Sequence, residues 1–339
     1  MELQHIESDL KRLRTRVKGL TSELLTVDRQ LVELIEQINI SRGYTNNSGT
    51  KEIVTGTTSK DRNGQPEISI CGVFRNNGAW LRTWALNRFK SLEQDLNIKY
   101  YFYENDSRDS TKHLLHEFMH GTEAVEVNRR GRVVCENTKS TKIFKRDTSL
   151  DRIQNIANAR NNMLELRPFY GEWTLMLDSE TYFPPDLIHQ FLDMKIEDDV
   201  VAVSCNGKNK TRCKHHINRG CRHYYDTLAM IDRHGVLGFN YSAKNGFSCC
   251  HLSDEFDREK WASGEPVEVL SAFGGACFYR TEILNRQHLK YEVNISHPFG
   301  ASRKKMLYCE HWDFHEQLRE YGRIISHPGL VVSNEINLF

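Results

Sequence analysis

The order of apolar and polar positions divides the chain into a heptad region, a polar stretch and a long alternating region. Apolar residues recur in steps of three and four at Leu3, Ile6, Leu10, Leu13, Val17, Leu20, Leu24, Val27, Leu31, Leu34 and Ile38. Charged residues flank this narrow stripe, as in the seam of a coiled coil. We therefore predict a coiled-coil helix over residues 1–40 that forms a homo-oligomer through residues 3–38. A single amphipathic helix that folds back on the domain is the alternative.

Residues 41–66 are rich in Ser, Thr, Asn and Gly and have little apolar periodicity, which predicts a flexible linker. Beyond them, apolar runs typical of strands alternate with helical periodicity, which predicts one domain over residues 67–339. Strands are expected at 68–74, 98–104, 122–127 and 172–178, and helices at 80–96, 111–119, 150–166 and after Pro184-Pro185. This order predicts an α/β fold with a mostly parallel sheet and helices on both faces. The basic stretch 128–147 interrupts the alternation and is expected to be a mobile loop, either a plain charged surface or a lid near a diphosphate.

The charge balance argues against a nucleic-acid partner, because 46 Lys and Arg face 45 Asp and Glu, for a net charge of +1. The N-terminus has neither a signal-peptide core nor an apolar run of about 18 residues, so we expect no membrane span and a cytoplasmic location. The nine cysteines are scattered, which favours reduced thiols.

An acidic motif follows the apolar strand expected at 172–178. Asp178 and Glu180 come at the carboxyl end of this strand, the end at which ligands bind in open α/β sheets. Carboxylate oxygens with this spacing suit Mn²⁺ or Mg²⁺, and such an ion can bridge the diphosphate of a nucleotide sugar. The motif alone has low specificity, since most such pairs lie in surface turns.

Several segments, in this order, resemble the fungal capsule α-1,3-mannosyltransferases, the cryptococcal mannosyltransferase family. That family has an E-x-x-S-x-D-x-T turn, an R-N-x-x-L helix and an acidic motif followed by F-x-P-x-D-x-L, and this chain has similar features, with FPPDL after its acidic motif. The resembling segments are 101–111 (YFYENDSRDST), 152–192 (RIQNIANARNNMLELRPFYGEWTLMLDSETYFPPDLIHQFL), 224–235 (YYDTLAMIDRHG), 266–284 (PVEVLSAFGGACFYRTEIL) and 309–332 (CEHWDFHEQLREYGRIISHPGLVV).

This resemblance implies a GT-A fold, a nucleotide-sugar donor and Mn²⁺, with GDP-mannose as the donor of the family. The expected function is metal-dependent transfer of a sugar from GDP-mannose or another nucleotide sugar to a glycan or glycoprotein acceptor. The chain departs from the family at its acidic triplet, which is Asp-Ser-Glu in place of Asp-x-Asp, and in its coiled coil, which replaces a membrane anchor.

The resemblance also implies roles for residues near the donor. Glu104, Asp106 and Asp109 occupy the position where similar enzymes contact the nucleotide base and ribose. An Asx turn that caps the helix beginning near Thr111 is an equally compatible role for the two aspartates.

Two arginines and two glycines complete the predicted donor site. Arg75 and Arg160 can each bind phosphate through two parallel hydrogen bonds or form a structural ion pair. Gly274 and Gly275 allow a tight turn or close approach of a ligand to the backbone, and in GT-A enzymes such a segment lies under the sugars.

Three further residues are candidates from the C-terminal segment. Glu310 and Asp313 lie where the resemblance places an acidic acceptor-side motif, and one of them is expected to accept a proton or to stabilise the developing charge on the sugar. His327 resembles a C-terminal histidine that completes the metal shell with Asp178 and Glu180 in some GT-A enzymes. Each of these side chains has an ordinary structural role as its alternative.

Two other functions remain open. The chain is alternatively an inactive, oligomeric module that binds carbohydrate or nucleotide sugar, or a nucleotidyltransferase, although the segment FRNNGAW after the first strand lacks a phosphate-binding glycine loop. A zinc site is a further alternative for the loop that carries Cys205, Cys213, His215, His216, Cys221 and His223, although it lacks a C-x2-C pair.

The heptad region generates a test of the quaternary structure. Light scattering at micromolar concentration should show an oligomer for the full chain and a folded monomer after removal of residues 1–60, because the heptads lie before the linker and all site residues after it. A monomeric full chain would contradict the prediction.

Overall fold

The computed structural model gives the architecture of most of the predicted domain. The structure describes residues 52–56, 65–122, 125–126, 129, 131–138, 150–212, 222–224, 226–238, 251–294, 301–302, 305–306 and 309–334. The predicted coiled coil at residues 1–40 lies outside these ranges.

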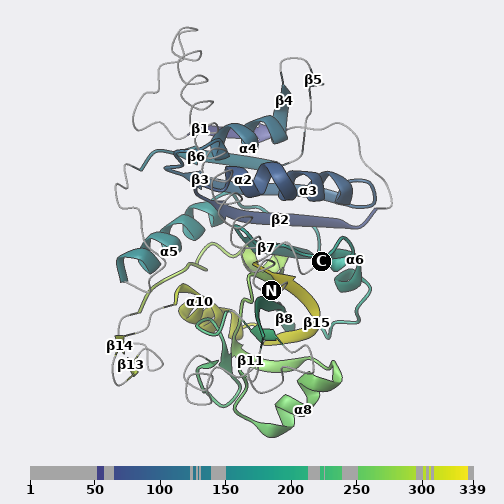
Figure 1. Ribbon diagram of the computed structural model, residues 1–339, viewed down its shortest axis with the longest axis vertical. Helices are drawn as coiled ribbons and strands as arrows, with labels where there is room; N and C mark the ends of the chain where they lie inside the picture. The colour runs from purple at the N-terminus through teal and green to yellow at the C-terminus, as the bar shows by residue number, and fades with distance from the viewer. Residues whose placement is uncertain are drawn as a thin grey trace, which may run out of the picture.

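A single large mixed sheet forms the centre of the molecule (Figure 1). Its strands lie in the order β1-β6-β3-β2-β7-β12-β8-β15-β11-β10, and β9 pairs with β8. The strands are β1 (Glu52–Gly56), β2 (Glu67–Phe74), β3 (Asn97–Asn105), β6 (Gly131–Glu136), β7 (Trp173–Asp178), β8 (Val200–Arg212), β9 (Arg222–Tyr224), β10 (Ile231–Asp232), β11 (Val267–Ser271), β12 (Ala276–Arg280) and β15 (Arg323–Ser333). Two small hairpins pair β4 (Gly121–Thr122) with β5 (Val125–Glu126) and β13 (Ala301–Ser302) with β14 (Lys305–Met306).

The sheet is parallel in one half and mainly antiparallel in the other. Strands β6, β3, β2 and β7 are parallel, whereas β12 is antiparallel to both β7 and β8, and β11 is antiparallel to β15. The expectation of a mostly parallel sheet is therefore wrong for the second half. Strand β12 is inserted between β7 and β8 and runs opposite to both, while β8 and β15 are parallel to each other.

Helices cover both faces of this sheet, as predicted. They are α2 (Gly78–Trp80), the π-helix η1 (Leu81–Ala85), α3 (Leu86–Leu92), α4 (Thr111–His120), α5 (Leu150–Leu164), α6 (Leu187–Leu192), α8 (Glu255–Ser263), α9 (Thr281–Leu284) and α10 (Glu310–Arg319). Along β3, Tyr100 and Phe102 pack with residues of α3, α4 and α6, whereas Tyr101 and Tyr103 belong to the cluster of α5 and α10. Successive side chains of a strand point to opposite faces, so an almost wholly apolar strand needs a helical layer on each side.

Three segments differ from the sequence prediction. Strand β6 lies inside the stretch 128–147 that was expected to be a loop, and it pairs in parallel with β3. Strand β1 lies inside the expected linker and pairs with β6 at the sheet edge. The helix expected at 80–96 ends at Leu92 and contains a π-helical turn, an irregularity that periodicity does not reveal.

Local sequence explains where α8 begins and ends. The Asp254 side chain accepts a hydrogen bond from the backbone N–H of Asp257 at 3.0 Å, which satisfies one of the unpaired donors of the first turn. Gly264 ends the helix in the left-handed conformation with a φ of 93°. A side chain is disfavoured at this φ, so glycine suits the position.

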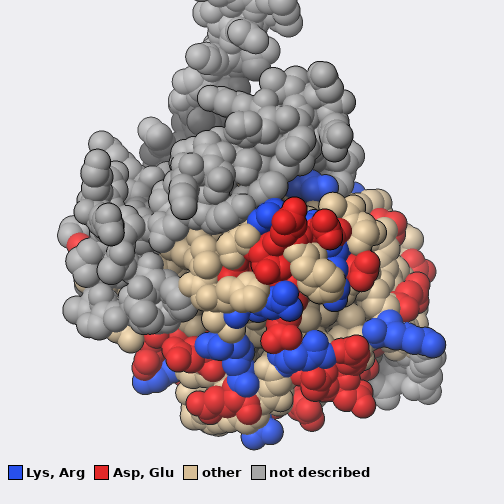
Figure 2. Space-filling view, turned by 90° about the horizontal axis from the view of Figure 1, so that it is seen from below, with Lys and Arg blue, Asp and Glu red and all other residues tan. Residues whose placement is uncertain are grey.

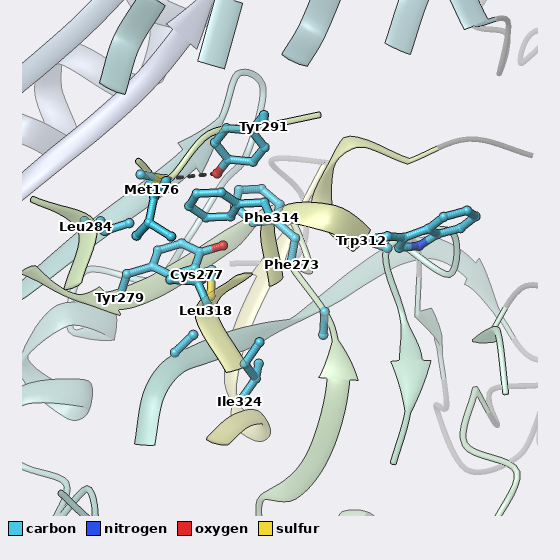
Figure 3. Packing of buried hydrophobic residues seen from close by; sticks show 14 of the residues in the cluster. Met176, Phe273, Cys277, Tyr279, Leu284, Tyr291, Trp312, Phe314, Leu318 and Ile324 are labelled. Atoms are coloured by element: carbon cyan, nitrogen blue, oxygen red, sulfur yellow. Dashed lines mark hydrogen bonds between the residues drawn. The ribbon is translucent and has the colours of Figure 1, made fainter. Parts of the chain in front are cut away.

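The core beneath α10 is built from aromatic side chains of several elements (Figure 3). Tyr291 stacks on Phe314 with ring centroids 4.0 Å apart, and its hydroxyl lies 3.4 Å from the sulfur of Met176 on β7. Aromatic pairs of this kind contribute about 0.5–1.5 kcal/mol beyond the area that they bury. These contacts hold α10 against the sheet and thereby fix the start of the helix, where Glu310 lies.

The surface and the cysteines agree with the composition. Figure 2 shows acidic and basic side chains intermixed on the described part of one face. The cysteines within the described residues are buried and unpaired: Cys71, Cys135, Cys205, Cys277 and Cys309. Among the helices that the structure describes, none has the length and the apolar character needed to span a bilayer.

A buried histidine in α10 makes the stability of the fold depend on pH. The ring of His315 contacts the hydroxyls of Ser271 and Tyr279 through its two nitrogens, each at 2.9 Å. Burial, assisted by the charges of Arg319 and Arg160, lowers the pKa of His315 to about 3. The imidazole thus stays neutral in the folded chain, whereas in the unfolded chain it binds a proton below its ordinary pKa of about 6.5.

We expect the free energy of unfolding to decrease as the pH is lowered from about 6.5 to about 3. His315 should contribute about 1.4 kcal/mol per pH unit to this decrease. Urea unfolding of the wild type and of His315→Asn at about pH 6 and pH 4 measures this contribution. The substitution lowers stability at both pH values but should make the dependence on pH shallower. If the wild type and His315→Asn lose the same free energy of unfolding between the two pH values, His315 does not make this contribution.

Candidate functional site

Several of the predicted site residues lie together at one edge of the sheet, where β7 ends and α10 begins. Strand β7 ends at Asp178, and its parallel neighbours β2 and β3 end at the same edge. Helix α10 begins with Glu310, and α5 carries Arg160. Ligands of α/β proteins bind at the carboxyl ends of the strands, so the position agrees with the prediction made for Asp178.

The guanidinium of Arg160 joins two of the predicted carboxylates. Its Nη2 donates a hydrogen bond to Oδ1 of Asp178 at 2.6 Å, and its Nε donates one to Oε1 of Glu310 at 3.1 Å. The side chains of Arg160 and Glu310 are 5% and 8% exposed, whereas that of Asp178 is 39% exposed. Asp178 is therefore the carboxylate of this group that solvent and ligands reach most easily.

The surroundings of Arg160 favour its charged form. The guanidinium carbon lies 4.8 Å from the ring centroid of Phe273 and 5.5 Å from that of Tyr291. Burial opposes the charge, but Asp178 and Glu310 outweigh it and raise the pKa of Arg160 well above its ordinary value. The arginine is thus a permanent cation between the two carboxylates.

The glycine turn Gly274-Gly275 lies directly against Asp178. The carbonyl of Gly275 accepts hydrogen bonds from the N–H of Asp178 at 2.9 Å and from Oγ1 of Thr181 at 3.1 Å. Both glycines have positive φ, 68° and 85°. A Cβ on Gly274 would lie 2.0 Å from the carbonyl oxygen of Cys205. The turn therefore requires glycine at this position, as the sequence indicated.

A third carboxylate, that of Asp226, belongs to this site and was not predicted. Its Oδ2 accepts a hydrogen bond from the N–H of Gly274 at 2.9 Å. Burial, followed by the charge of Asp178, raises the pKa of Asp226 to about 7. The residue lies in the segment YYDTLAMIDRHG, one of those that carry the family resemblance, and this was the available signal.

The residues predicted to contact the nucleotide lie after β2 and at the end of β3. The carboxylate of Glu104 is buried and accepts a hydrogen bond from the N–H of Ser107 at 2.8 Å, and burial raises its pKa. Asp106 has a φ of 55° and accepts a hydrogen bond from the Thr138 hydroxyl. Arg75 follows β2, and its N–H donates a hydrogen bond to the side chain of Asn77.

Asp109 occupies the structural role that the sequence left open for it. Its Oδ1 accepts a hydrogen bond from the N–H of Thr111 at 3.0 Å, at the start of α4. Its Oδ2 accepts one from the N–H of Gly78 at 2.8 Å, at the start of α2. The side chain thereby ties the first turns of two helices together, and the roles of Glu104, Asp106, Asp109 and Arg75 in nucleotide binding stay predictions.

Glu310 and Asp313 lie on α10 but have different surroundings. Glu310 contacts Arg160, and Nε2 of His311 lies 3.5 Å from its Oε1. Asp313 accepts a hydrogen bond from the N–H of Asn294 at 3.0 Å. The structure thus joins Glu310 to Asp178 through one arginine, whereas the recorded bond of Asp313 supports a neighbouring segment.

The predicted metal ligands occupy two places. Glu180 is exposed and has a φ of 64°, in the turn that follows Asp178. His327 lines a hollow together with Met194, Val200 and Ile325, and its Nδ1 accepts a hydrogen bond from Gly329. The structure records no contact of His327 with the acidic motif among its described residues, and its role as a ligand stays a prediction.

Another group of potential ligand atoms lies near α8. His234, Asp254 and Asp257 each offer one ligand atom, and these three atoms lie within 4.8 Å of one another. Within the described residues, this is the one such group of three His, Cys, Asp or Glu side chains. Arg233 already occupies this group, because its Nε lies 2.9 Å from Oδ2 of Asp257 and its Nη2 lies 3.5 Å from Oδ1 of Asp254. A metal would have to displace this guanidinium.

For the suggested zinc site, Cys205 is buried in the core, and the other side chains lie outside the described part.

Comparison with known protein families matches residues 68–310 to the family described as Cryptococcal mannosyltransferase 1. Among the curated proteins, no match is found.

Solved glycosyltransferase structures are similar at low identity. The mannosyltransferase PcManGT from Pyrobaculum calidifontis, in complex with GDP-Man and Mn²⁺, is 12% identical with a TM-score of 0.42, and the match covers 82% of this chain and 59% of that chain. TarS 1–349 from S. aureus is 13% identical with a TM-score of 0.42, and the match covers 79% of this chain and 60% of that one. Its complex with UDP-GlcNAc gives 12% identity and a TM-score of 0.41, with 79% and 58% covered. The chain thus matches less than two thirds of the length of each.

Assignment to a family rests on the family match and not on these distant structures. The matched range begins in β2, contains the acidic motif and the glycine turn, and ends at Glu310. It covers more than half of the chain. The protein therefore belongs to the family described as Cryptococcal mannosyltransferase 1.

Proposed function

We propose that this chain is a metal-dependent glycosyltransferase that moves a hexose from a nucleotide sugar to a hydroxyl group of a glycan or glycoprotein. The observation that carries the proposal is the buried Arg160, which holds Asp178 and Glu310 at one edge of the sheet. A residue that anchors the donor and a residue that accepts a proton must both lie beside the same sugar. The family supports a mannosyl donor, and GDP-mannose is the first to test.

Asp178 and Glu180 fit a hard divalent cation. Both offer carboxylate oxygens, Glu180 is exposed, and the Asp178 side chain is 39% exposed. Mg²⁺ and Mn²⁺ are commonly held by one or two protein carboxylates, with phosphate oxygens and water as the other ligands. The chemistry that a bound cation supplies is neutralisation of the charge on the leaving diphosphate.

Glu310 is the proposed proton acceptor. The acceptor oxygen forms a bond to the anomeric carbon, the bond from this carbon to the donor phosphate breaks, and the nucleoside diphosphate leaves with the electron pair. The proton of the acceptor hydroxyl passes to Glu310. Arg160 bonds only Oε1 of Glu310 among the recorded contacts, and this fixes the orientation of the carboxylate.

The roles of the remaining residues follow from their places. Gly274 and Gly275 form the proposed floor beneath the donor sugar, because their turn bonds Asp178 through the carbonyl of Gly275. Arg75, Glu104 and Asp106 lie beside the ends of β2 and β3, on the nucleotide side. The oligomer through residues 3–38 and the cytoplasmic location belong to the same proposal and rest on the sequence alone.

Removing either carboxylate of the acidic motif should weaken the metal-dependent binding of the donor. Asp178→Asn and Glu180→Gln retain shape but lose charge, and each should weaken binding of GDP-mannose by at least about tenfold, the usual cost of losing even an outer-shell partner of a metal. Calorimetric titration with Mn²⁺, and with a chelator in its place, measures the effect. Asp186→Asn is the matched control, because this exposed carboxylate bonds Gln190 nearby.

Circular dichroism checks that these variants fold. Equal, metal-independent binding by the wild type and by the double variant Asp178→Asn, Glu180→Gln would remove the metal site from the proposal.

Glu310→Gln should lower turnover by about 10²–10⁴-fold while the affinity for the donor stays nearly the same, because a general base acts in the transition state. Asp313→Asn is the matched variant on the same helix. Its oxygen can still accept the hydrogen bond from Asn294, so turnover should stay close to that of the wild type. Initial rates with saturating donor give the turnover of both variants. A larger loss of turnover in Asp313→Asn than in Glu310→Gln would make Asp313, and not Glu310, the proton acceptor.

A further inference from the structure

Asp226 lies in a segment that is fixed to both parts of the candidate site. Its Oδ2 accepts a hydrogen bond from the N–H of Gly274 at 2.9 Å. Two residues later, the carbonyl of Leu228 accepts a hydrogen bond from Nε1 of Trp312 at 2.8 Å, which ties the segment to α10. The glycine turn and the helix of Glu310 therefore determine where the carboxylate of Asp226 lies.

Within the described residues, the second oxygen of Asp226, Oδ1, has no recorded hydrogen bond. Among the described residues, the only hydrogen bond recorded for this side chain is the one from Gly274 to Oδ2. The residue is half-buried, so part of it reaches the surface of the described structure.

Asp226 contacts the glycine turn beside Asp178, the part of the site assigned to the sugar in the proposed function. The negative charges of Asp178 and Glu310 both act on its carboxylate and help to raise its pKa. The turn that it contacts bonds Asp178 through the carbonyl of Gly275. A sugar whose phosphate is anchored near Asp178, and whose anomeric carbon is approached from Glu310, lies over this turn.

We propose that Asp226 accepts a hydrogen bond from a hydroxyl of the donor sugar through Oδ1 and thereby selects which sugar is transferred. This inference rests on the proposed function, because it assigns a specificity residue to the same site. A hydroxyl donor favours the ionised form of this carboxyl, and hydrogen bonds to an ionised carboxylate are stronger than those between neutral groups. A site built to bond a hydroxyl also rejects analogues that lack it, since its own polar group is then left unpaired.

Asp226→Asn separates contact with the sugar from support of the turn. The amide oxygen can still accept the hydrogen bond from Gly274, while the amide nitrogen, a donor, replaces the second acceptor oxygen. Asp254→Asn is the matched control. It removes the same charge from a helix cap near α8, where asparagine caps equally well.

The experiment is calorimetric titration in Mn²⁺ with four probes: GDP, GDP-mannose, UDP and UDP-GlcNAc. Asp226→Asn should bind the sugar nucleotide that the wild type prefers about tenfold more weakly, the effect of losing one hydrogen bond to a charged group. Its affinity for the matching nucleoside diphosphate should be unchanged, and Asp254→Asn should match the wild type throughout.

The outcomes separate this inference from the proposed function. Unchanged affinity of Asp226→Asn for the sugar nucleotide, or an equal loss for the nucleoside diphosphate, would overturn the inference alone, because the carboxylate would then not contact the sugar. A wild-type protein that binds none of the four probes in Mn²⁺ would overturn the proposed function and the inference with it.

Discussion

The candidate site depends on one buried cation. Arg160 on α5 bonds Asp178 at the end of β7 and Glu310 at the start of α10, so a single guanidinium holds three elements together. Two buried charges without a partner would each cost several kcal/mol, and removal of one member of such a group typically costs about 3–5 kcal/mol. Any ligand that takes over Asp178 must therefore leave Arg160 paired with Glu310.

The two halves of the sheet supply different parts of the site. The parallel strands β2, β3 and β7 end together and present the acidic motif. The antiparallel half supplies the glycine turn, which lies between β11 and β12, and supports α10. The pairing of β7 with β12 joins the halves, and it places Gly275 against Asp178. The acidic motif and the glycine turn thus meet where the strand direction changes.

The sequence predicted the central strands and the acidic motif because their signals are local. Strands β2, β3 and β7 are continuous apolar runs, and Asp178 follows one of them directly. Strand β6 was missed because its sequence, GRVVCE, is short and lies within a basic stretch, and only pairing with β3 makes it a strand. Its burial, with Val133 and Val134 in opposite clusters, is a tertiary effect that periodicity cannot show.

For the site, the sequence indicated Arg160, Asp178, Glu310 and the glycines but not how they connect. The ion pairs of Arg160 join residues that are distant in the chain, and Asp226 has no local feature that distinguishes it from a surface aspartate. Asp109 illustrates the opposite case, because one local pattern fitted two roles and only the bonds to Gly78 and Thr111 reveal the structural one.

The distance along the chain between Arg160 and Glu310 has a consequence for biosynthesis. The two partners are 150 residues apart, so their ion pair closes one of the long loops of the fold. Contacts of such separation form late, since the entropy of loop closure must be overcome first. In a nascent chain that has not yet emerged beyond α10, Arg160 has Asp178 but lacks Glu310, the second of its two carboxylate partners. The group of Asp178, Arg160 and Glu310 is therefore complete only after the helix near the end of the chain has been synthesised.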